Sequence, residues 1–270
     1  MRGLLGRVCF VLGLCLAALP LQAAVQVRPV EWEIEGRGFS GVLVYDDANA
    51  IRRPGLVMVP NWMGVGREAI EMAERVAGHD YVVLVADVYG SEIRPKDDAE
   101  ALEAVKGAYA DGGGSLRERA RKAVDVLRAQ ANEAPLDAER IGAIGFCFGG
   151  SVVLELARSG SDIPRGVVSF HGGLDSYRPV DGGKIGTSVL VLNGADDSSV
   201  TDAQIAAFER EMDEAGADWQ FVNFSGARHC FSQPEDADNP PDDNCRYDER
   251  AAKRSFEMMR DFFRERFAGK

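Results

Sequence analysis

Short, continuous runs of apolar residues recur along the chain, and longer segments with helical spacing separate them. Continuous apolar runs of this length are typical of strands buried on both faces of a sheet. We expect such strands at residues 55–59, 81–86, 141–144, 166–170, 188–192 and 219–224. Helical spacing predicts helices at residues 67–77, 97–110, 116–131, 151–157, 200–215 and 248–267. The alternation predicts an α/β fold with a mainly parallel, doubly wound sheet and helices on both faces.

Two alternating segments precede this pattern, at residues 30–34 and 41–45. Their alternation predicts an antiparallel hairpin, joined through residues 36–38. The glycine run at 112–114 lacks the lysine and serine or threonine context of a phosphate-binding loop, so we expect a plain loop there. No repeat or linker interrupts the chain, which predicts a single domain over residues 25–270.

The first 24 residues have the pattern of a secretory signal peptide. Arg2 and Arg7 provide the positive start, an apolar stretch covers residues 8–19, and small residues at Ala23 and Ala24 offer a cleavage site. The apolar stretch is short for a membrane-spanning helix. We therefore expect cleavage, a periplasmic or secreted mature protein, and no stable membrane insertion afterwards.

The charge balance narrows the range of partners. The chain has 270 residues and a formal net charge of −12. An acidic surface repels phosphate backbones, and the basic patch of a nucleic-acid-binding protein is missing. We expect a small-molecule substrate, no nucleic-acid partner and a monomeric protein.

Cysteine usage fits an exported protein. Two of the 5 cysteines, Cys9 and Cys15, lie in the expected signal peptide, which leaves Cys147, Cys230 and Cys245. An odd number in an oxidising compartment suggests one disulfide and one free reactive thiol. Cys230 and Cys245 flank a polar loop and form the natural pair. Two unrelated free thiols in that loop are the alternative.

The free cysteine lies in a sequence that predicts a sharp strand-to-helix turn. Residues 145–150 read Gly-Phe-Cys-Phe-Gly-Gly, and they join an apolar strand to an apolar helix. Gly-x-Cys-x-Gly is the nucleophile elbow of α/β hydrolases with cysteine in place of serine. The following helix directs its amide groups at the sulfur, which favours a thiolate. A buried structural cysteine is the alternative, because free cysteine is among the most buried residue types.

An acid and a base follow Cys147 in the chain order of α/β hydrolases. Asp196 and Asp197 come after the strand at 188–192, and His229 comes after the last strand. Parallel strands bring their carboxyl ends to one edge, so these side chains should meet. Imidazole would take the thiol proton while carboxylate fixes its tautomer. Of the other histidines, His79 precedes a strand at the opposite edge, and His171 precedes the aspartates.

The motifs around these residues, including Ala86-Asp87-Val88-Tyr89-Gly90, resemble the dienelactone hydrolase family over essentially the whole mature chain. The resemblance implies cofactor-free hydrolysis of an ester or lactone by Cys147, His229 and an acid. It favours Asp197 over Asp196 as that acid. It also implies an oxyanion hole formed by the backbone N–H groups of Trp62 and Phe148.

The chain departs from this family at several pocket positions. Asn61 replaces the glutamate that pairs with the resting thiol, so activation would fall to His229. Dienelactone-specific members hold a substrate carboxylate with two arginines, and the matching positions are Ser91 and Gln233. Arg94 is a nearby substitute. Aromatic and sulfur-containing side chains are expected at the mouth of the substrate pocket, with core packing as the alternative; they include Met63, Tyr89 and Phe231, together with Trp62 and Phe146.

The sequence thus predicts an exported hydrolase that cleaves a small carboxylic ester or lactone through a thioester on Cys147. The acidic run at 235–243 does not have the spacing of a calcium loop, so no metal is assigned. The alternative is a non-catalytic relative that binds a ligand or senses oxidants through Cys147, since a thiolate in an oxidising compartment is open to sulfenic acid formation.

Overall fold

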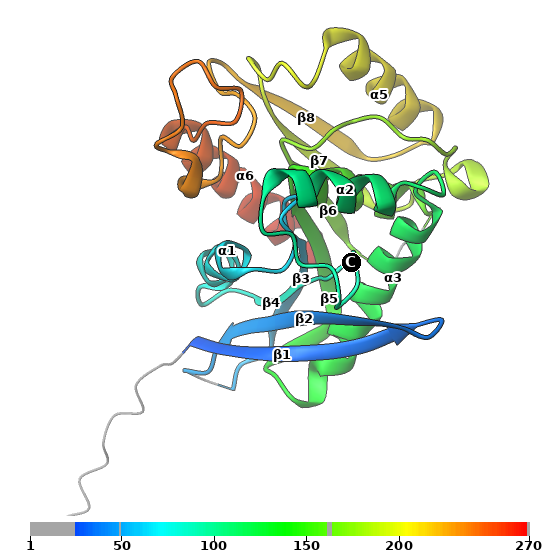
Figure 1. Ribbon diagram of the computed structural model, residues 1–270. Coiled ribbons are helices and arrows are strands. Elements are labelled where there is room, and N and C mark those ends of the chain that lie inside the picture. The colour runs from blue at the N-terminus through cyan, green and yellow to red at the C-terminus, as the bar shows by residue number, and fades with distance from the viewer. Residues whose placement is uncertain (1–24, 49, 161–163, 269–270) are drawn as a thin grey trace, which may run out of the picture.

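The computed structural model describes residues 25–48, 50–160 and 164–268 (Figure 1). Its centre is an eight-stranded sheet with the order β1-β2-β4-β3-β5-β6-β7-β8. The strands are β1 (Val25–Ile34), β2 (Arg37–Asp46), β3 (Arg53–Val59), β4 (Val82–Val85), β5 (Leu136–Phe146), β6 (Gly166–Phe170), β7 (Ser188–Gly194) and β8 (Trp219–Phe224). The pairs β1–β2 and β2–β4 are antiparallel, and the other neighbouring pairs are parallel. The predicted signal peptide lies outside the described residues.

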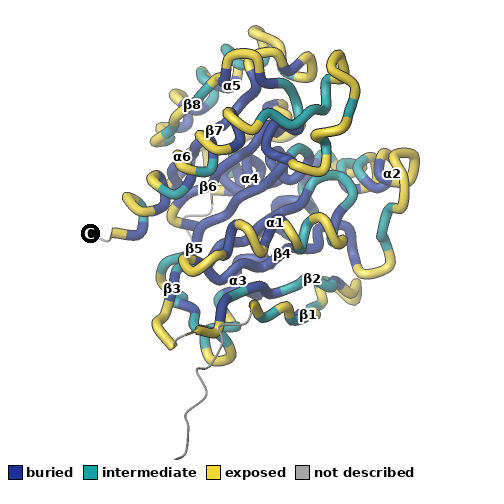
Figure 2. The backbone as a smooth tube through the Cα atoms, turned by 90° about the vertical axis from the view of Figure 1, so that its left-hand side faces the viewer, coloured by how far each residue is buried: buried dark blue, intermediate teal, exposed yellow. Residues whose placement is uncertain are grey.

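Helices cover both faces of this sheet, as the sequence predicts. They are α1 (Arg67–Ala77), α2 (Asp98–Ala108), α3 (Gly114–Ala129), α4 (Phe148–Arg158), α5 (Asp202–Glu214) and α6 (Glu249–Phe267). Buried side chains of α1 and α6 share one core cluster, and those of α2, α3, α4 and α5 share the other. The central strands β3, β4, β6 and β7 are almost entirely buried between them, whereas the edge strands β1 and β8 are partly exposed (Figure 2).

The expected element boundaries need correction at several places; among them, strand β1 begins at Val25 rather than at residue 30. The hairpin turns at Glu35 and Gly36, where φ is 49° and 81°, and Ile34 already pairs with Arg37. Positive φ at both turn residues matches the twist of the two strands, which explains the tight turn. Helix α3 begins at Gly114, so the glycine run is partly its first turn. Strand β5 begins at Leu136 rather than at residue 141.

The strand order creates a crevice between β3 and β5. The connection through α1 carries the chain from β3 to β4, and the connection through α4 carries it from β5 to β6, in the opposite direction. Helices α1 and α4 lie on opposite faces, so the loops after β3 and β5 diverge. Ligands of doubly wound sheets bind in such a crevice. The loop 60–66 and Cys147 lie at this point.

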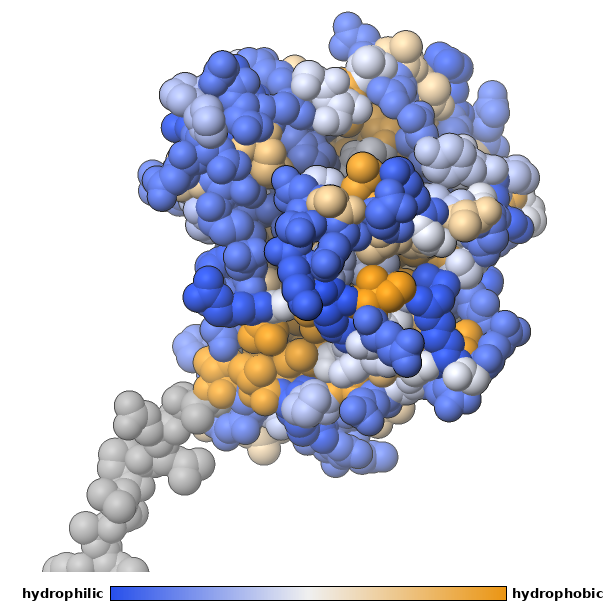
Figure 3. Space-filling model, viewed as in Figure 1, coloured by the Kyte–Doolittle hydropathy of each residue, from blue (hydrophilic) through white to orange (hydrophobic). Residues whose placement is uncertain are grey.

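The molecular surface is largely hydrophilic in the view of Figure 3, with a hydrophobic patch beside the start of β1. This strand contributes the exposed side chains of Val25 and Val27. Over the residues that the structure describes, no helix combines the length and apolar character needed to cross a bilayer.

Candidate active site

Cys147 occupies a strained turn between β5 and α4. Its φ is 52° and its ψ is −118°, a conformation that residues other than glycine rarely adopt. A Cβ atom on Gly145 would lie 2.0 Å from the carbonyl oxygen of Gly149, and one on Gly149 would lie 2.1 Å from that of Val59. Close backbone contacts therefore require both glycines, as the elbow motif predicts.

The structure brings together the three side chains that the sequence predicts as catalytic. His229 Nε2 lies 3.0 Å from Cys147 Sγ, and His229 Nδ1–H donates a hydrogen bond of 2.7 Å to Asp197 Oδ2. The other oxygen of Asp197 accepts hydrogen bonds from the Ser199 amide and the Asn244 side chain. The Asp197 side chain is fully buried, whereas Asp196 is exposed. The geometry therefore agrees with Asp197 as the acid.

The contacts among Cys147, His229 and Asp197 shift the pKa values of the histidine and the aspartate. Burial alone lowers the pKa of His229, but hydrogen bonds to Asp197 and Cys147 and the negative charges of both raise it to about 10. Burial alone raises the pKa of Asp197, but the His229 hydrogen bond and charge, with the Ser199 and Asn244 bonds, lower it overall. An imidazole with this pKa holds its proton at neutral pH, beside the sulfur.

The loop after β3 places Trp62 next to the elbow. The Asn61 carbonyl accepts the Gly64 amide at 3.0 Å, and the Asn61 side-chain oxygen accepts the Met63 amide at 3.0 Å. These bonds fix the turn that carries the Trp62 amide. Phe148 is the first residue of α4, where amide groups have no acceptor within the helix. The Asn61 side-chain oxygen is thus used to shape this loop.

Tyr89 connects the two residues of the expected oxyanion hole. Its hydroxyl group donates a hydrogen bond of 2.9 Å to the Trp62 carbonyl, and its ring stacks on Phe148 at 5.2 Å. Tyr89 is 2% exposed, so it supports the pocket from below rather than lining its mouth. Asp87 accepts the amides of Tyr89 and Gly90, which explains why the Asp-Val-Tyr-Gly motif contains an acid.

The guanidinium group of Arg94 is bound by other groups of the protein. It forms an ion pair of 3.0 Å with the buried carboxylate of Asp87. It also donates to the carbonyl groups of Ser40, Gly90 and Ile93. These bonds tie the loop after β4 to β2 and give Arg94 an anchoring role.

Phe231 also differs from its expected place at the pocket mouth. It is fully buried and packs edge-on against His171 at 5.2 Å and near Phe224. Cys230, with φ of 60°, turns the chain inward directly after His229. Trp62 and Met63 remain partly exposed, as a pocket lining requires, whereas Phe146 is buried.

His171 forms an unpredicted support beneath the elbow. It is fully buried, and its Nδ1 accepts the Cys147 amide at 3.2 Å. The other ring nitrogen must therefore carry the proton, which it donates to Ser232 Oγ at 2.8 Å. Burial, followed by the charge of His229, lowers the pKa of His171 well below 6.5. His171 thus stays neutral. Its position directly after β6 indicates from the sequence that it lies near the site. Because it precedes the aspartates in the chain, the order of the triad residues excludes it as the base.

A disulfide holds the loop that carries His229. Cys230 and Cys245 are bonded, as the sequence predicts, and Cys147 is free. The Arg246 amide donates to the His229 carbonyl at 2.9 Å, which pairs the two ends of the loop. In the described part of the chain, the candidate metal ligands that cluster are Cys230, Asp236 and Cys245. The bonded sulfurs offer no thiolate, so this cluster does not fit a metal.

The fold and this arrangement define an α/β hydrolase with a cysteine beside a histidine and an aspartate. The sequence profile of the dienelactone hydrolase family matches residues 39–267, so the chain belongs to that family. It is a hydrolase of carboxylic esters or lactones.

Two solved structures and one curated protein are similar to this chain. A structure named m3DLH is 35% identical, with a TM-score of 0.82 over 90% of this chain and 99% of its own. The dienelactone hydrolase-like promiscuous phosphotriesterase P91, from metagenomic libraries, is also 35% identical, with a TM-score of 0.81 over 90% and 98%. The uncharacterised protein K02A2.1 of Caenorhabditis elegans is 34% identical over 58% of this chain and 98% of its own.

Proposed function

We propose that this protein hydrolyses a small ester or lactone through a thioester on Cys147. The observation that carries the proposal is the continuous contact from Sγ through His229, at 3.0 Å, to Asp197, at 2.7 Å. An adjacent base held by a third group is the general arrangement that activates a nucleophile. Asp197 holds the imidazole in the tautomer that directs Nε2 at the sulfur.

In the first half of the reaction, the Cys147 proton already resides on His229, and the thiolate sulfur attacks the carbonyl carbon. The carbonyl electron pair moves onto oxygen, where the amides of Trp62 and Phe148 donate hydrogen bonds to the negative charge. As the charged oxygen re-forms the carbonyl, the carbon–oxygen ester bond breaks. His229 gives its proton to the departing alkoxide, and the acyl group remains as a thioester.

In the second half, water attacks the thioester and gives a proton to His229. The tetrahedral species collapses, the carbon–sulfur bond breaks, and the carboxylic acid leaves with the sulfur restored. No cofactor enters either half. Both halves use the same oxyanion hole, so the loop held by Asn61 and Tyr89 serves two transition states.

Steady-state hydrolysis of p-nitrophenyl acetate tests this mechanism. We expect Cys147→Ala to lower kcat/KM at least about a thousandfold, as loss of a nucleophile does elsewhere. Full activity of Cys147→Ala would contradict the mechanism, whereas a wild-type protein without any activity would favour a ligand-binding or oxidant-sensing role.

Arg94→Gln should leave the relative rates of neutral and carboxylate-bearing esters within about twofold, because its guanidinium binds Asp87 and three carbonyl groups of the protein.

Phosphotriesters are a second candidate substrate class. The observation that favours them is the 35% identity over 90% of this chain to P91, which is described as a promiscuous phosphotriesterase. The same sulfur would attack phosphorus and expel an alkoxide that takes the His229 proton. Paraoxon hydrolysis that Cys147→Ala abolishes would support this class. Stoichiometric inactivation without turnover would restrict the protein to carboxylic esters and lactones.

We also propose export to the periplasm or outside the cell. The signal-peptide pattern of residues 1–24 and the disulfide between Cys230 and Cys245 support this location, because disulfides persist in oxidising compartments. Expression of the full chain in a bacterium, followed by fractionation and N-terminal sequencing, tests it. Mature protein that begins near residue 24 or 25 is the expected result. A cytoplasmic chain that retains Met1 would contradict it.

A further inference from the structure

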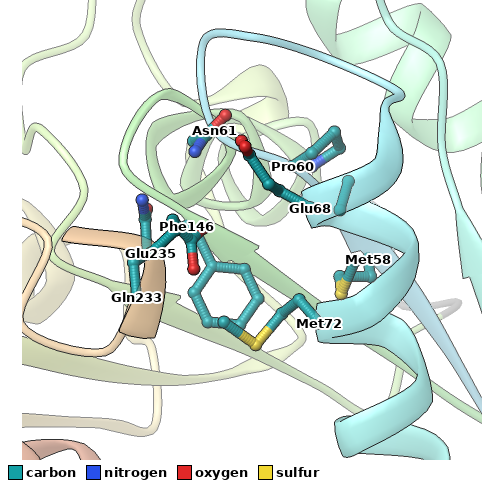
Figure 4. A pocket seen from close by; sticks show the side chains of 9 residues that line it. Met58, Pro60, Asn61, Glu68, Met72, Phe146, Gln233 and Glu235 are labelled. Atoms are coloured by element: carbon teal, nitrogen blue, oxygen red, sulfur yellow. The ribbon is translucent and has the colours of Figure 1, made fainter. Parts of the chain in front are cut away.

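A small pocket of about 20 Å³ lies between the start of α1, the end of β5 and the loop that follows His229. Figure 4 shows Asn61 and Glu68 on one side of it, Gln233 and Glu235 on another, and Phe146 in the middle. The remaining lining residues are Met58, Pro60, Ala69 and Met72. A volume of this size holds about one water-sized group.

The pocket is linked to the catalytic residues through their chain neighbours. Asn61 directly precedes Trp62, Phe146 directly precedes Cys147, and Gln233 follows His229 by four positions. The charge of His229 also acts on Asp236, the neighbour of Glu235. The pocket therefore lies at the segments that carry Trp62, Cys147 and His229.

The polar atoms of the pocket are mainly hydrogen-bond acceptors. Gln233 is 4% exposed, and its side-chain nitrogen donates to Asp236 at 2.9 Å. Its side-chain oxygen is buried and has no hydrogen-bond partner among the described residues. A buried oxygen without a donor costs free energy that a bound donor recovers.

Two carboxylates reinforce this acceptor character. The Glu235 side chain is 24% exposed, and Glu68, an exposed residue in the first turn of α1, stands opposite it. Arg75 approaches Glu235 at 4.0 Å, the outer limit of an ion pair. Burial and the nearby charges of Asp236 and Glu68 raise the pKa of Glu235 against this weak compensation. The pocket therefore favours a positively charged donor and repels a carboxylate.

We propose that this pocket binds the primary ammonium end of an amine-bearing ester substrate, with Glu68, Glu235 and the Gln233 oxygen as its acceptors. The proposal rests on the hydrolase function proposed above and names the substrate class of the same site. An ammonium group has the size of the pocket and several donors for the acceptors around it. Charge-assisted hydrogen bonds of this kind distinguish substrates strongly when the site is partly desolvated.

Three matched acetate esters test the proposal: 5-aminopentyl acetate, pentyl acetate and 5-acetoxypentanoate. We expect the wild-type enzyme to hydrolyse the ammonium ester with a kcat/KM about tenfold above that of the neutral ester, with the carboxylate ester lowest. The double variant Glu68→Gln/Glu235→Gln should reduce all differences among the three esters to within about twofold. The Gln233→Leu variant should lose part of the preference.

A matched control removes the same charge elsewhere. Glu31→Gln/Glu33→Gln changes two exposed acids of β1 and should keep the wild-type preference. Equal loss in the control would mean that net charge, rather than the pocket, selects the substrate, and this would overturn the proposal. A wild-type enzyme that prefers the carboxylate ester, or shows no preference, would overturn it as well.

Two further measurements separate ammonium binding from turnover and from binding of a free cation. Absence of turnover on all three esters would contradict the hydrolase function; calorimetry of pentylammonium against pentanol then tests the pocket by itself, and equal affinities would overturn the ammonium assignment. Ammonium chloride and potassium chloride test a free cation. Saturable stabilisation by either ion, lost in Glu68→Gln/Glu235→Gln and accompanied by no preference among the esters, would reassign the pocket to an inorganic cation.

Discussion

The nucleophile and its base are held in place by different means. Cys147 lies between β5 and α4, and every neighbour from residue 141 to 158 except Cys147 itself is buried. His229 lies on a long polar loop between β8 and α6, which is much more exposed (Figure 2). Core packing fixes the elbow, whereas the disulfide, the Arg246 amide and the Asp197 bond fix the histidine.

The packing of the core thus positions Cys147, whereas His229 depends on a disulfide and on hydrogen bonds of its loop. Elbow damage should therefore disrupt the whole protein. Damage to the histidine loop should lower activity more than it lowers overall stability. The following variants and conditions probe this difference, in order of decreasing effect.

The largest effect is expected from Gly149→Ala. The added Cβ would lie 2.1 Å from the Val59 carbonyl oxygen, in a place where backbone cannot move freely. We expect a loss of about 4 kcal/mol or more in unfolding free energy, measured by urea denaturation, or a failure to fold. Gly107→Ala is the control, because nothing lies within 4 Å of its Cβ in α2, and it should gain up to about 1 kcal/mol. Equal stability of both variants would contradict the packed elbow.

Asp197→Asn should affect catalysis while the fold persists. Asparagine cannot carry the charge that holds the His229 tautomer, so kcat should fall about 10²- to 10⁴-fold. Asp196→Asn, at the exposed neighbour, should retain activity within about twofold. Kinetics on p-nitrophenyl acetate with both purified variants gives the result. A reversed order would assign the acid to Asp196.

Reduction of the Cys230–Cys245 disulfide should loosen the histidine loop. The bond spans 15 residues, and loss of such a cross-link costs about 3 kcal/mol. The variant Cys230→Ser/Cys245→Ser should lose about tenfold in kcat, because His229 would no longer be held against Sγ. Both proteins are assayed without reductant after titration of the free Cys147 thiol, which controls for its oxidation. Unchanged kcat would show that the remaining loop contacts suffice.

The smallest effect concerns pH. The folded-state pKa of His229 is raised to about 10 from 6.5, so its contribution to stability is complete below pH 6.5 and disappears as pH rises towards 10. The Tm difference between wild type and His229→Gln should shrink over this window in thermal-shift measurements. A difference that stays constant from pH 6.5 to 10 would contradict the charged imidazole.

Much of the fold follows from local patterns in the sequence. Buried runs such as residues 55–59 and 188–192 announce parallel strands, because both faces of each strand are covered. The Gly-x-Cys-x-Gly motif announces the elbow through the lack of space at Gly145 and Gly149. Chain order then brings Asp197 and His229 to Cys147, since parallel strands end at one edge.

The finer roles depend on contacts that sequence order does not reveal. Phe231 follows His229 closely, yet the positive φ of Cys230 buries it. Arg94 is engaged by Asp87 and three carbonyl groups, which come together only in the folded loop. His171 supports the Cys147 amide through a specific ring orientation. Such hydrogen bonds follow from side-chain rotamers and three-dimensional neighbours rather than from residue type.

Intact-mass and peptide mass spectrometry during reaction with p-nitrophenyl acetate tests the central claim most directly. Rapid acid quenching should trap one acetyl group per chain, and fragmentation should place it on Cys147. His229→Gln should slow its formation, and Cys147→Ala should abolish it together with nitrophenol release. An acetyl group on another residue, or steady nitrophenol release from Cys147→Ala, would contradict the proposed nucleophile.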